Sequence, residues 1–144
     1  MSGLVSTQQQ TPDLVCFTSL EQREYFSSSN GVILGNEDIN YLSNLTYIYW
    51  PLYVEPELKN IIGYRTGTSE IFINKETRFD TNWSFPFGCL FSIGYIDSFG
   101  ANAPPGDIQI IGGTKDFFGV TGRIKFINDP KSKVRKVEIY LNKN

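Results

Sequence analysis

Residues 107–127, DIQIIGGTKDFFGVTGRIKFI, contain the turn that decides the fold. An apolar strand runs into Gly112-Gly113-Thr114, and an alternating strand resumes after Gly119 and Gly122. A glycine pair at the end of a strand permits a positive φ or a close approach of two backbones. Glycines at the start of the next strand let a closed sheet bend. The stretch therefore predicts two neighbouring strands of a strongly curved sheet.

The rest of the chain consists of short strand-like segments separated by turns. Six further segments are rich in β-branched and aromatic residues: 14–20, 44–50, 61–73, 79–87, 90–99 and 134–141. Pro51 is expected to end the second of these, and Gly88-Cys89 to form a tight turn before the fifth. No segment has a helical period, and the stretch between residues 27 and 38 is expected to be a long loop.

Eight strands with short connections predict an all-β fold, an eight-stranded antiparallel up-and-down β-barrel. Closing the sheet removes its unpaired edges, and a barrel of about this size either fills with side chains or holds one small ligand. The 144-residue length fits one domain, which we place at residues 13–144. Residues 1–12 are polar and Gln-rich, so we expect a disordered tail there.

Composition excludes several classes of function. The net charge of −2 argues against nucleic-acid binding. The absence of histidine removes Ser-His-Asp and Cys-His catalysis and most zinc sites. Cys16 and Cys89 fit no metal spacing, so we expect no metal and no cofactor. The chain shows neither a secretory signal nor a membrane-spanning run, which predicts a cytoplasmic protein without a membrane partner.

The opening stretch resembles the hallmark turn of allene oxide cyclases and dirigent proteins. The passages LYVEPELKNIIG (52–63) and WSFPFG (83–88) resemble passages of the same families, in the same order. The similarity spans roughly residues 14–141. It implies an allene oxide cyclase/dirigent-like barrel, a superfamily that includes spirotetronate-type cyclases. Such barrels enclose a conjugated lipophilic chain and fold it for ring closure. By analogy with these families we expect a homo-oligomer, a dimer or a trimer.

The family's catalytic groups are replaced in this sequence. Phe17 and Ser19 stand where allene oxide cyclases have a Glu-x-Asn pair, and Trp50 stands where they have an asparagine. Ser69 stands where the family has a cysteine, and Asp97 stands near the position of the family's ligand-pocket tyrosine. We therefore do not predict an allene oxide cyclase. Dirigent proteins are secreted and use aspartates on early strands, and this chain has neither feature.

The same alignment of strands predicts which side chains point into the barrel. We assign Arg65 and Asp97 as catalytic, forming a buried ion pair or an acid–base group. The substrate-binding candidates are Phe17, Ser19, Thr46, Ile48, Trp50, Ser69 and Tyr95.

A shift of one residue reverses these faces, so alternatives stay open. Arg65 points outward if Tyr64, Thr66 and Phe72 face in, and Glu70 then becomes the candidate carboxylate. Asp97 is otherwise a solvated strand-end group. Trp50 either walls a pocket or fills the core. Tyr47, Tyr49 and Trp83 are expected to point outward, and Lys131, Lys133, Arg135 and Lys136 to form a solvated basic tip.

The sequence favours a cofactor-independent cyclase or isomerase. It would enclose a conjugated hydrophobic molecule derived from a polyketide or a lipid and template its ring closure. The alternative is a non-catalytic, lipocalin-like carrier of such a ligand. A third possibility is a filled barrel that serves only as an oligomeric interaction module. A polar group such as Arg65 with Asp97 beside an apolar wall favours catalysis over storage.

Overall fold

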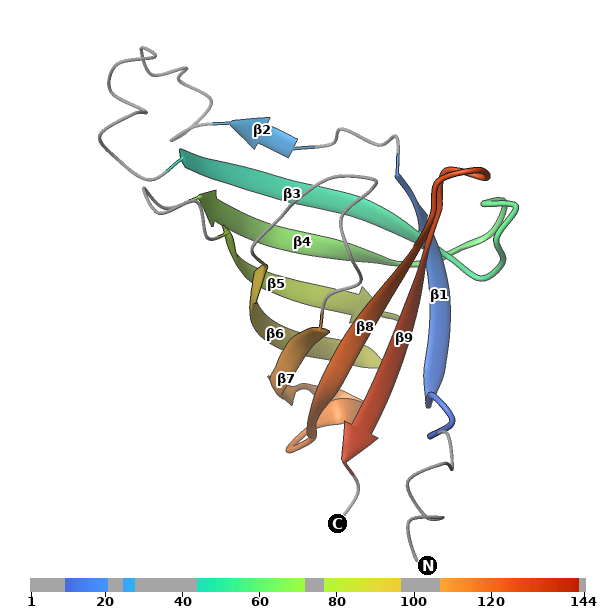
Figure 1. Cartoon of the computed structure of the whole chain (residues 1–144). Helices are drawn as coiled ribbons and strands as arrows, with labels where there is room; N and C mark the ends of the chain where they lie inside the picture. Colours follow the sequence, from blue (N-terminus) through green and yellow to red (C-terminus); the bar gives the residue numbers. More distant parts are fainter. Residues whose placement is uncertain (1–9, 21–24, 28–43, 72–76, 97–106, 143–144) are drawn as a thin grey trace, which may run out of the picture.

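The computed structural model describes residues 10–20, 25–27, 44–71, 77–96 and 107–142, of which 25–27, 44–47, 71, 77, 95–96 and 107 are described by their backbone alone. These residues form one antiparallel sheet of nine strands and a short 3₁₀ helix, η2 (Figure 1). The strands are β1 (Leu14–Ser19), β2 (Tyr25–Ser27), β3 (Asn44–Tyr53), β4 (Ile61–Ile71), β5 (Thr77–Phe85), β6 (Gly88–Ile96), β7 (Asp107–Gly113), β8 (Thr121–Asp129) and β9 (Val134–Asn142); η2 spans Lys115–Phe117.

The sheet closes on itself through β1. This strand pairs along its length with β9, and Phe17 also pairs with Tyr53 of β3. β2 pairs with the first half of the same edge of β3, so β1 and β2 share one position around the barrel. The Thr18 hydroxyl adds a 3.0 Å hydrogen bond to the Pro51 carbonyl across the β1–β3 seam. The predicted fold, a closed eight-stranded antiparallel β-barrel, is confirmed.

Alternation along the strands separates the interior from the surface. On β5 the buried side chains are Phe79, Thr81, Trp83 and Phe85, and the exposed ones between them are Asp80, Asn82 and Ser84. This period of two is the pattern of a strand with one buried face. Because antiparallel partners share a face, the inward set on one strand fixes the inward set on its neighbours.

One end of the barrel is filled by the Gly-Gly-Thr turn and η2, and we call it the plugged end. The backbone N–H of Thr114 donates to the Cys89 carbonyl at 2.9 Å, and the N–H of Cys89 donates to the Thr114 hydroxyl at 3.0 Å. This turn directs Phe117 of η2 onto the ring of Phe87, with centroids 5.5 Å apart. A Cβ at Gly113 would lie 2.6 Å from the Cys89 carbonyl oxygen, so the close approach requires glycine.

Three local expectations are wrong. β3 continues through Pro51 to Tyr53. The backbone carbonyl of Pro51 points towards β1, where it accepts from Thr18, and the backbone nitrogen that lacks a hydrogen points to the same side. Because β1 and β3 make a single pairing there, the proline costs no β3–β4 hydrogen bond. Gly88 begins β6, and the β5–β6 turn consists of Pro86 and Phe87. The strand β2 was not anticipated, since three residues carry too short a pattern to recognise.

Residues 1–9 of the tail that we predicted lie outside the described residues. Among the residues that are described, no helix has the length and apolar character needed to cross a membrane.

Candidate functional site

Arg65 of β4 lies at the centre of the barrel and is fully buried, with 0% of its surface exposed. Four aromatic rings surround its guanidinium carbon. The centroids of Trp50 and Trp83 lie 4.7 Å from it, and those of Phe79 and Phe126 lie 5.2 Å from it. The strand register explains the two shortest contacts, because Arg65 pairs directly with Trp50 on β3 and with Trp83 on β5. A cation over an aromatic face is attracted by the ring quadrupole.

Arg65 separates two apolar clusters in the interior. The larger cluster extends from the plugged end and includes Trp83 and Phe126. The smaller one consists of Ile48, Trp50 and Phe79, towards the opposite end of β3 and β5. The charged group therefore lies between two apolar parts of the barrel core, which is unusual because arginine is seldom fully buried unless it is paired.

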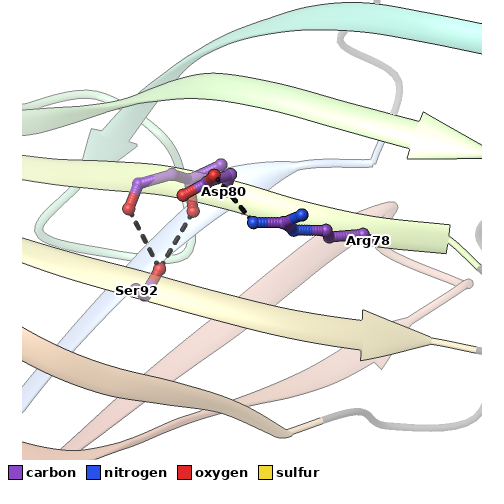
Figure 2. A network of polar contacts seen from close by, with 4 residues as sticks. Arg78, Asp80 and Ser92 are labelled. Carbon is purple, nitrogen blue, oxygen red and sulfur yellow. Dashed lines mark hydrogen bonds and ion pairs between the residues drawn. The ribbon is translucent and has the colours of Figure 1, made fainter.

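Hydroxyl groups on β5 and β6 hold one nitrogen of this guanidinium. Arg65 Nε donates to Thr81 Oγ1 at 3.2 Å, and Ser92 Oγ donates to the Thr81 carbonyl at 3.1 Å. Figure 2 shows the two contacts that join Ser92 to the neighbouring strand. Because the Ser92 proton is used on that carbonyl, the Thr81 hydroxyl donates to Ser92 Oγ, 3.0 Å away. Trp83 Nε1 also donates to Ser92 Oγ, at 2.9 Å. The bond that Ser92 donates to the Thr81 carbonyl therefore decides which group is the donor in the other hydrogen bonds of this network.

The remaining donors at this site have no acceptor among the described residues. Arg65 Nη1 and Nη2 are buried without a hydrogen-bond partner, and so is Trp50 Nε1. A guanidinium carries five N–H groups, so four of those of Arg65 are unused. Burial lowers the pKa of Arg65 well below its ordinary value, and the charge of Arg135 lowers that pKa further. The site is therefore rich in donors and positively charged, which suits an oxygen atom that bears negative charge.

A second arginine reaches the same rings from β9. The guanidinium carbon of Arg135 lies 4.9 Å from the centroid of Trp50 and 4.8 Å from that of Phe126. Its Nε donates to Asn128 Oδ1 at 2.8 Å, across the β8–β9 ladder. Burial lowers the pKa of Arg135 to about 10. Two cations thus share two aromatic rings, and their hydrogen-bond partners among the described residues are neutral.

The structure gives the position of most residues predicted for the site. Ile48, Trp50, Arg65 and Ser69 are buried on the inward face, as expected. Thr46 pairs with Ser69 and Tyr95 pairs with Arg78 in the ladder, but their side chains are not described. Asp97 lies outside the described residues, so the Arg65–Asp97 pair stays a prediction.

The inward orientation that we expected for Phe17 and Ser19 is wrong. Cys16 and Thr18 have no exposed surface, whereas Phe17 and Ser19 are only half-buried. Cys16 pairs with the inward Val137 of β9, which places Cys16 inside and turns Phe17 to the outer face. The error has a physical reason: both faces of this strand carry apolar residues, so its composition does not distinguish them.

Sequence reasoning also missed functional neighbours of Arg65. Trp83 was expected outside but has no exposed surface, and Arg135, which was assigned to a basic tip, stands beside the same rings. The signals were present. Polar residues at 80, 82 and 84 place Trp83 inside, and the apolar residues at 137 and 139 place Arg135 on the inward face. The outward expectation for Tyr49 is confirmed, because this residue is 42% exposed and stacks on Tyr64.

Glu70, the alternative carboxylate, is half-buried on the other face of β4, opposite Arg78 of β5. On the outer surface of β5, Arg78 makes a 3.4 Å ion pair with Asp80 (Figure 2). No cluster of three or more His, Cys, Asp or Glu residues suited to a metal ion occurs within the described part of the chain. The inward face of the barrel is therefore the candidate site.

Comparison with known proteins identifies the fold. No protein-family model matches the sequence, and no curated protein sequence matches it significantly. Solved structures do match. Pyocyanin demethylase superposes with a TM-score of 0.62 at 14% identity, over 90% of this chain and 100% of its own. The pterocarpan synthase dirigent protein GePTS1 has a TM-score of 0.65 at 16% identity, over 93% and 87%. AbnU, an exo-specific intermolecular Diels-Alderase, has a TM-score of 0.57 at 14% identity, over 91% and 95%.

These matches cover nearly the whole length of each partner chain. At 14–16% identity they establish a shared architecture, and the chemistry has to be argued from this chain's own residues. The chain has the same barrel fold as these proteins, among them a dirigent protein, which confirms at the level of the fold the resemblance found in its sequence.

Proposed function

We propose that the barrel is a cofactor-independent cyclase or isomerase that encloses a conjugated hydrophobic small molecule, derived from a polyketide or a lipid, and templates its ring closure. One observation carries the proposal: the fully buried Arg65 guanidinium presents two nitrogens without acceptors among the described residues, inside a ring of four aromatic side chains. The three neighbours of this fold support the general class, since they are named as a demethylase, a pterocarpan synthase and a Diels-Alderase.

The residues fit the two requirements of such a reaction. Trp50, Phe79 and Phe126 offer flat apolar surfaces that can hold a conjugated chain in a folded, near-attack shape. Positioning of this kind can contribute roughly 7–11 kcal/mol to lowering a barrier. An intramolecular ring closure exchanges π bonds for σ bonds within one molecule, so it needs no oxidant and releases no leaving group.

Arg65 would act directly on the reacting molecule. Its Nε is held by Thr81, which fixes the plane of the guanidinium and leaves both Nη atoms to donate to one carbonyl oxygen. Donors that are held in place before the reaction stabilise negative charge as it develops on that oxygen, at no further cost in reorganisation. In a barrel interior of low polarity this electrostatic effect is larger than it would be in water.

The test is a fluorescence titration, because both tryptophans of the chain contact Arg65. The ligands are a panel of conjugated fatty acids, tetronates and phenolics, and the proteins are the wild type, Trp50→Phe and the outer-face control Tyr49→Phe. We expect saturable quenching that weakens in Trp50→Phe and persists in Tyr49→Phe. Chromatography and mass spectrometry of the recovered ligand then detect a cyclised or isomerised product of unchanged mass.

Two results would change the proposal. Binding with complete recovery of the unchanged ligand, across the panel, would favour the non-catalytic carrier. No quenching by any ligand, with a folded barrel by circular dichroism, would favour a filled barrel that serves as an oligomeric interaction module. Size-exclusion chromatography with light scattering tests the homodimer or homotrimer that we expect in either case.

A further inference from the structure

The charges inside the barrel are unbalanced among the residues that the structure describes. Arg65 and Arg135 each lie near the rings of Trp50 and Phe126, and their hydrogen-bond partners among the described residues are a hydroxyl and an amide oxygen. Two ion pairs between other described residues, Arg78–Asp80 and Lys136–Glu138, involve outward-facing strand positions. A buried cation without a counter-ion is costly, and two that face the same rings also repel one another.

The two tryptophans beside Arg65 are anchored differently. Trp83 has no exposed surface, and its Nε1 is hydrogen-bonded to Ser92 at 2.9 Å. Trp50 is 5% exposed, the largest value among the four rings, and its Nε1 has no hydrogen-bond partner in the described part of the chain. The Arg65 Nη atoms are themselves covered, so a ligand atom reaches them only when a ring moves. Of the two tryptophans, Trp50 moves at the smaller cost, because no hydrogen bond to a described residue is lost.

We infer that the molecule bound at this site is an organic acid in its ionised form, a carboxylate or an ionised enol, whose oxygens accept hydrogen bonds from Arg65 Nη1 and Nη2 and whose charge lies within reach of Arg135. The inference rests on the proposed function and adds the charge of the ligand. Displacement of Trp50 from Arg65 accompanies binding.

The geometry favours an anion over a neutral carbonyl compound. A planar guanidinium with its Nη edge free matches the two oxygens of a delocalised oxyanion, and charged hydrogen bonds of this kind are about twice as strong as neutral ones. A neutral carbonyl would satisfy some donors and leave the repulsion between Arg65 and Arg135 in place. An anion reduces both the number of unsatisfied donors and the repulsion between the two arginines. The lowered pKa values of the two arginines, which burial causes, agree with this account because they record the cost that an anion would offset.

The test compares a fluorescent conjugated tetraenoic fatty acid with its methyl ester at pH 7.5. The proteins are the wild type, Arg65→Met, Arg135→Met and the control Arg123→Met, whose guanidinium lies over Tyr140 on the outer face, 4.5 Å from the ring centroid. We expect the wild type and Arg123→Met to bind the acid at least about tenfold more tightly than the ester. Arg65→Met should lose this preference, and Arg135→Met should reduce it.

The outcomes separate this inference from the proposed function. Equal affinity of the wild type for acid and ester would overturn the inference and leave the proposed function standing, whereas no binding of either compound would count against the proposed function itself. A preference for the acid that survives in both Arg65→Met and Arg135→Met would also overturn the inference, because the anion would then be held elsewhere. If Arg65→Met fails to fold, Arg65→Lys replaces it. The lysine ammonium keeps the charge but cannot form two parallel hydrogen bonds, so this variant should bind the acid several-fold more weakly. Unchanged binding would contradict the bidentate contact.

Discussion

Replacing Arg65 by methionine should change the stability of the ligand-free protein very little. The substitution removes a hydrogen bond from a charged donor to Thr81, which contributes about 1.5–3 kcal/mol. It also removes four cation–ring contacts, which contribute roughly 0.5–2 kcal/mol each. Against these losses, it removes two buried nitrogens without acceptors among the described residues, each of which costs about 1–3 kcal/mol, and it removes the desolvation penalty of a buried charge, which amounts to several kcal/mol.

The opposing contributions are of similar size, and the methionine fills much of the same volume. We therefore expect the free energy of unfolding to change by less than about 2 kcal/mol in either direction. Breaking a paired buried ion, by contrast, destabilises a protein by about 3–5 kcal/mol. The measurement is urea denaturation at pH 7.5, followed by tryptophan fluorescence and by far-UV circular dichroism, with Arg123→Met as the control.

A loss of about 4 kcal/mol or more, with an unchanged denaturant slope, would refute the reasoning. It would mean that Arg65 has a counter-ion in the folded protein and serves stability. A small change, combined with loss of ligand binding in the same variant, would mean that the buried charge is kept for its ligand. The two measurements together therefore separate a structural arginine from one that binds a substrate.

Three further predictions concern the barrel around the site. Gly67→Ala should destabilise the protein by at least about 2 kcal/mol in urea denaturation, because Gly67 has φ +146 and a Cβ there would lie 2.2 Å from the Asp80 carbonyl oxygen. Gly112→Ala, whose Cβ would meet only Phe91 at 3.8 Å, should cost less than about 1 kcal/mol, and equal losses would contradict this account. A double-mutant cycle of Trp83→Phe and Ser92→Ala should give a coupling of about 1 kcal/mol from their 2.9 Å hydrogen bond, whereas additive effects would argue against the network. Cys16, whose pKa burial raises to about 12, should resist thiol reagents at pH 8 until the protein unfolds. In the unfolded chain the Cys16 thiol ionises near pH 9.0, so its burial in the protonated form contributes fully to the free energy of unfolding below pH 9. Between pH 9 and about pH 12 this contribution falls by about 1.4 kcal/mol per pH unit, and Cys16→Ala should remove that pH dependence.

The sequence predicted the barrel because its signals are local. The strand 134–141 alternates strongly, and the glycines at 112, 113, 119 and 122 mark where a curved sheet turns. The inward positions of Trp50 on β3 and of Arg65 on β4 agree with the faces that the family resemblance implied. On β1 the prediction failed, because Val15, Cys16 and Phe17 are all apolar and only pairing with β9 places Cys16 inside.

The order of residues alone thus indicated an all-β fold of short strands and the glycine turn between β7 and β8, since these depend on neighbours two to four positions apart. The tertiary structure decided the character of the site. The rings around Arg65 come from β3, β5 and β8, and Arg135 comes from β9, so their meeting depends on closure of the barrel. Whether an arginine is solvated or buried with unused donors is a property of that closed interior. The physical reason is that the cost of a charge is set by the water and the partners around it, and a linear pattern specifies neither.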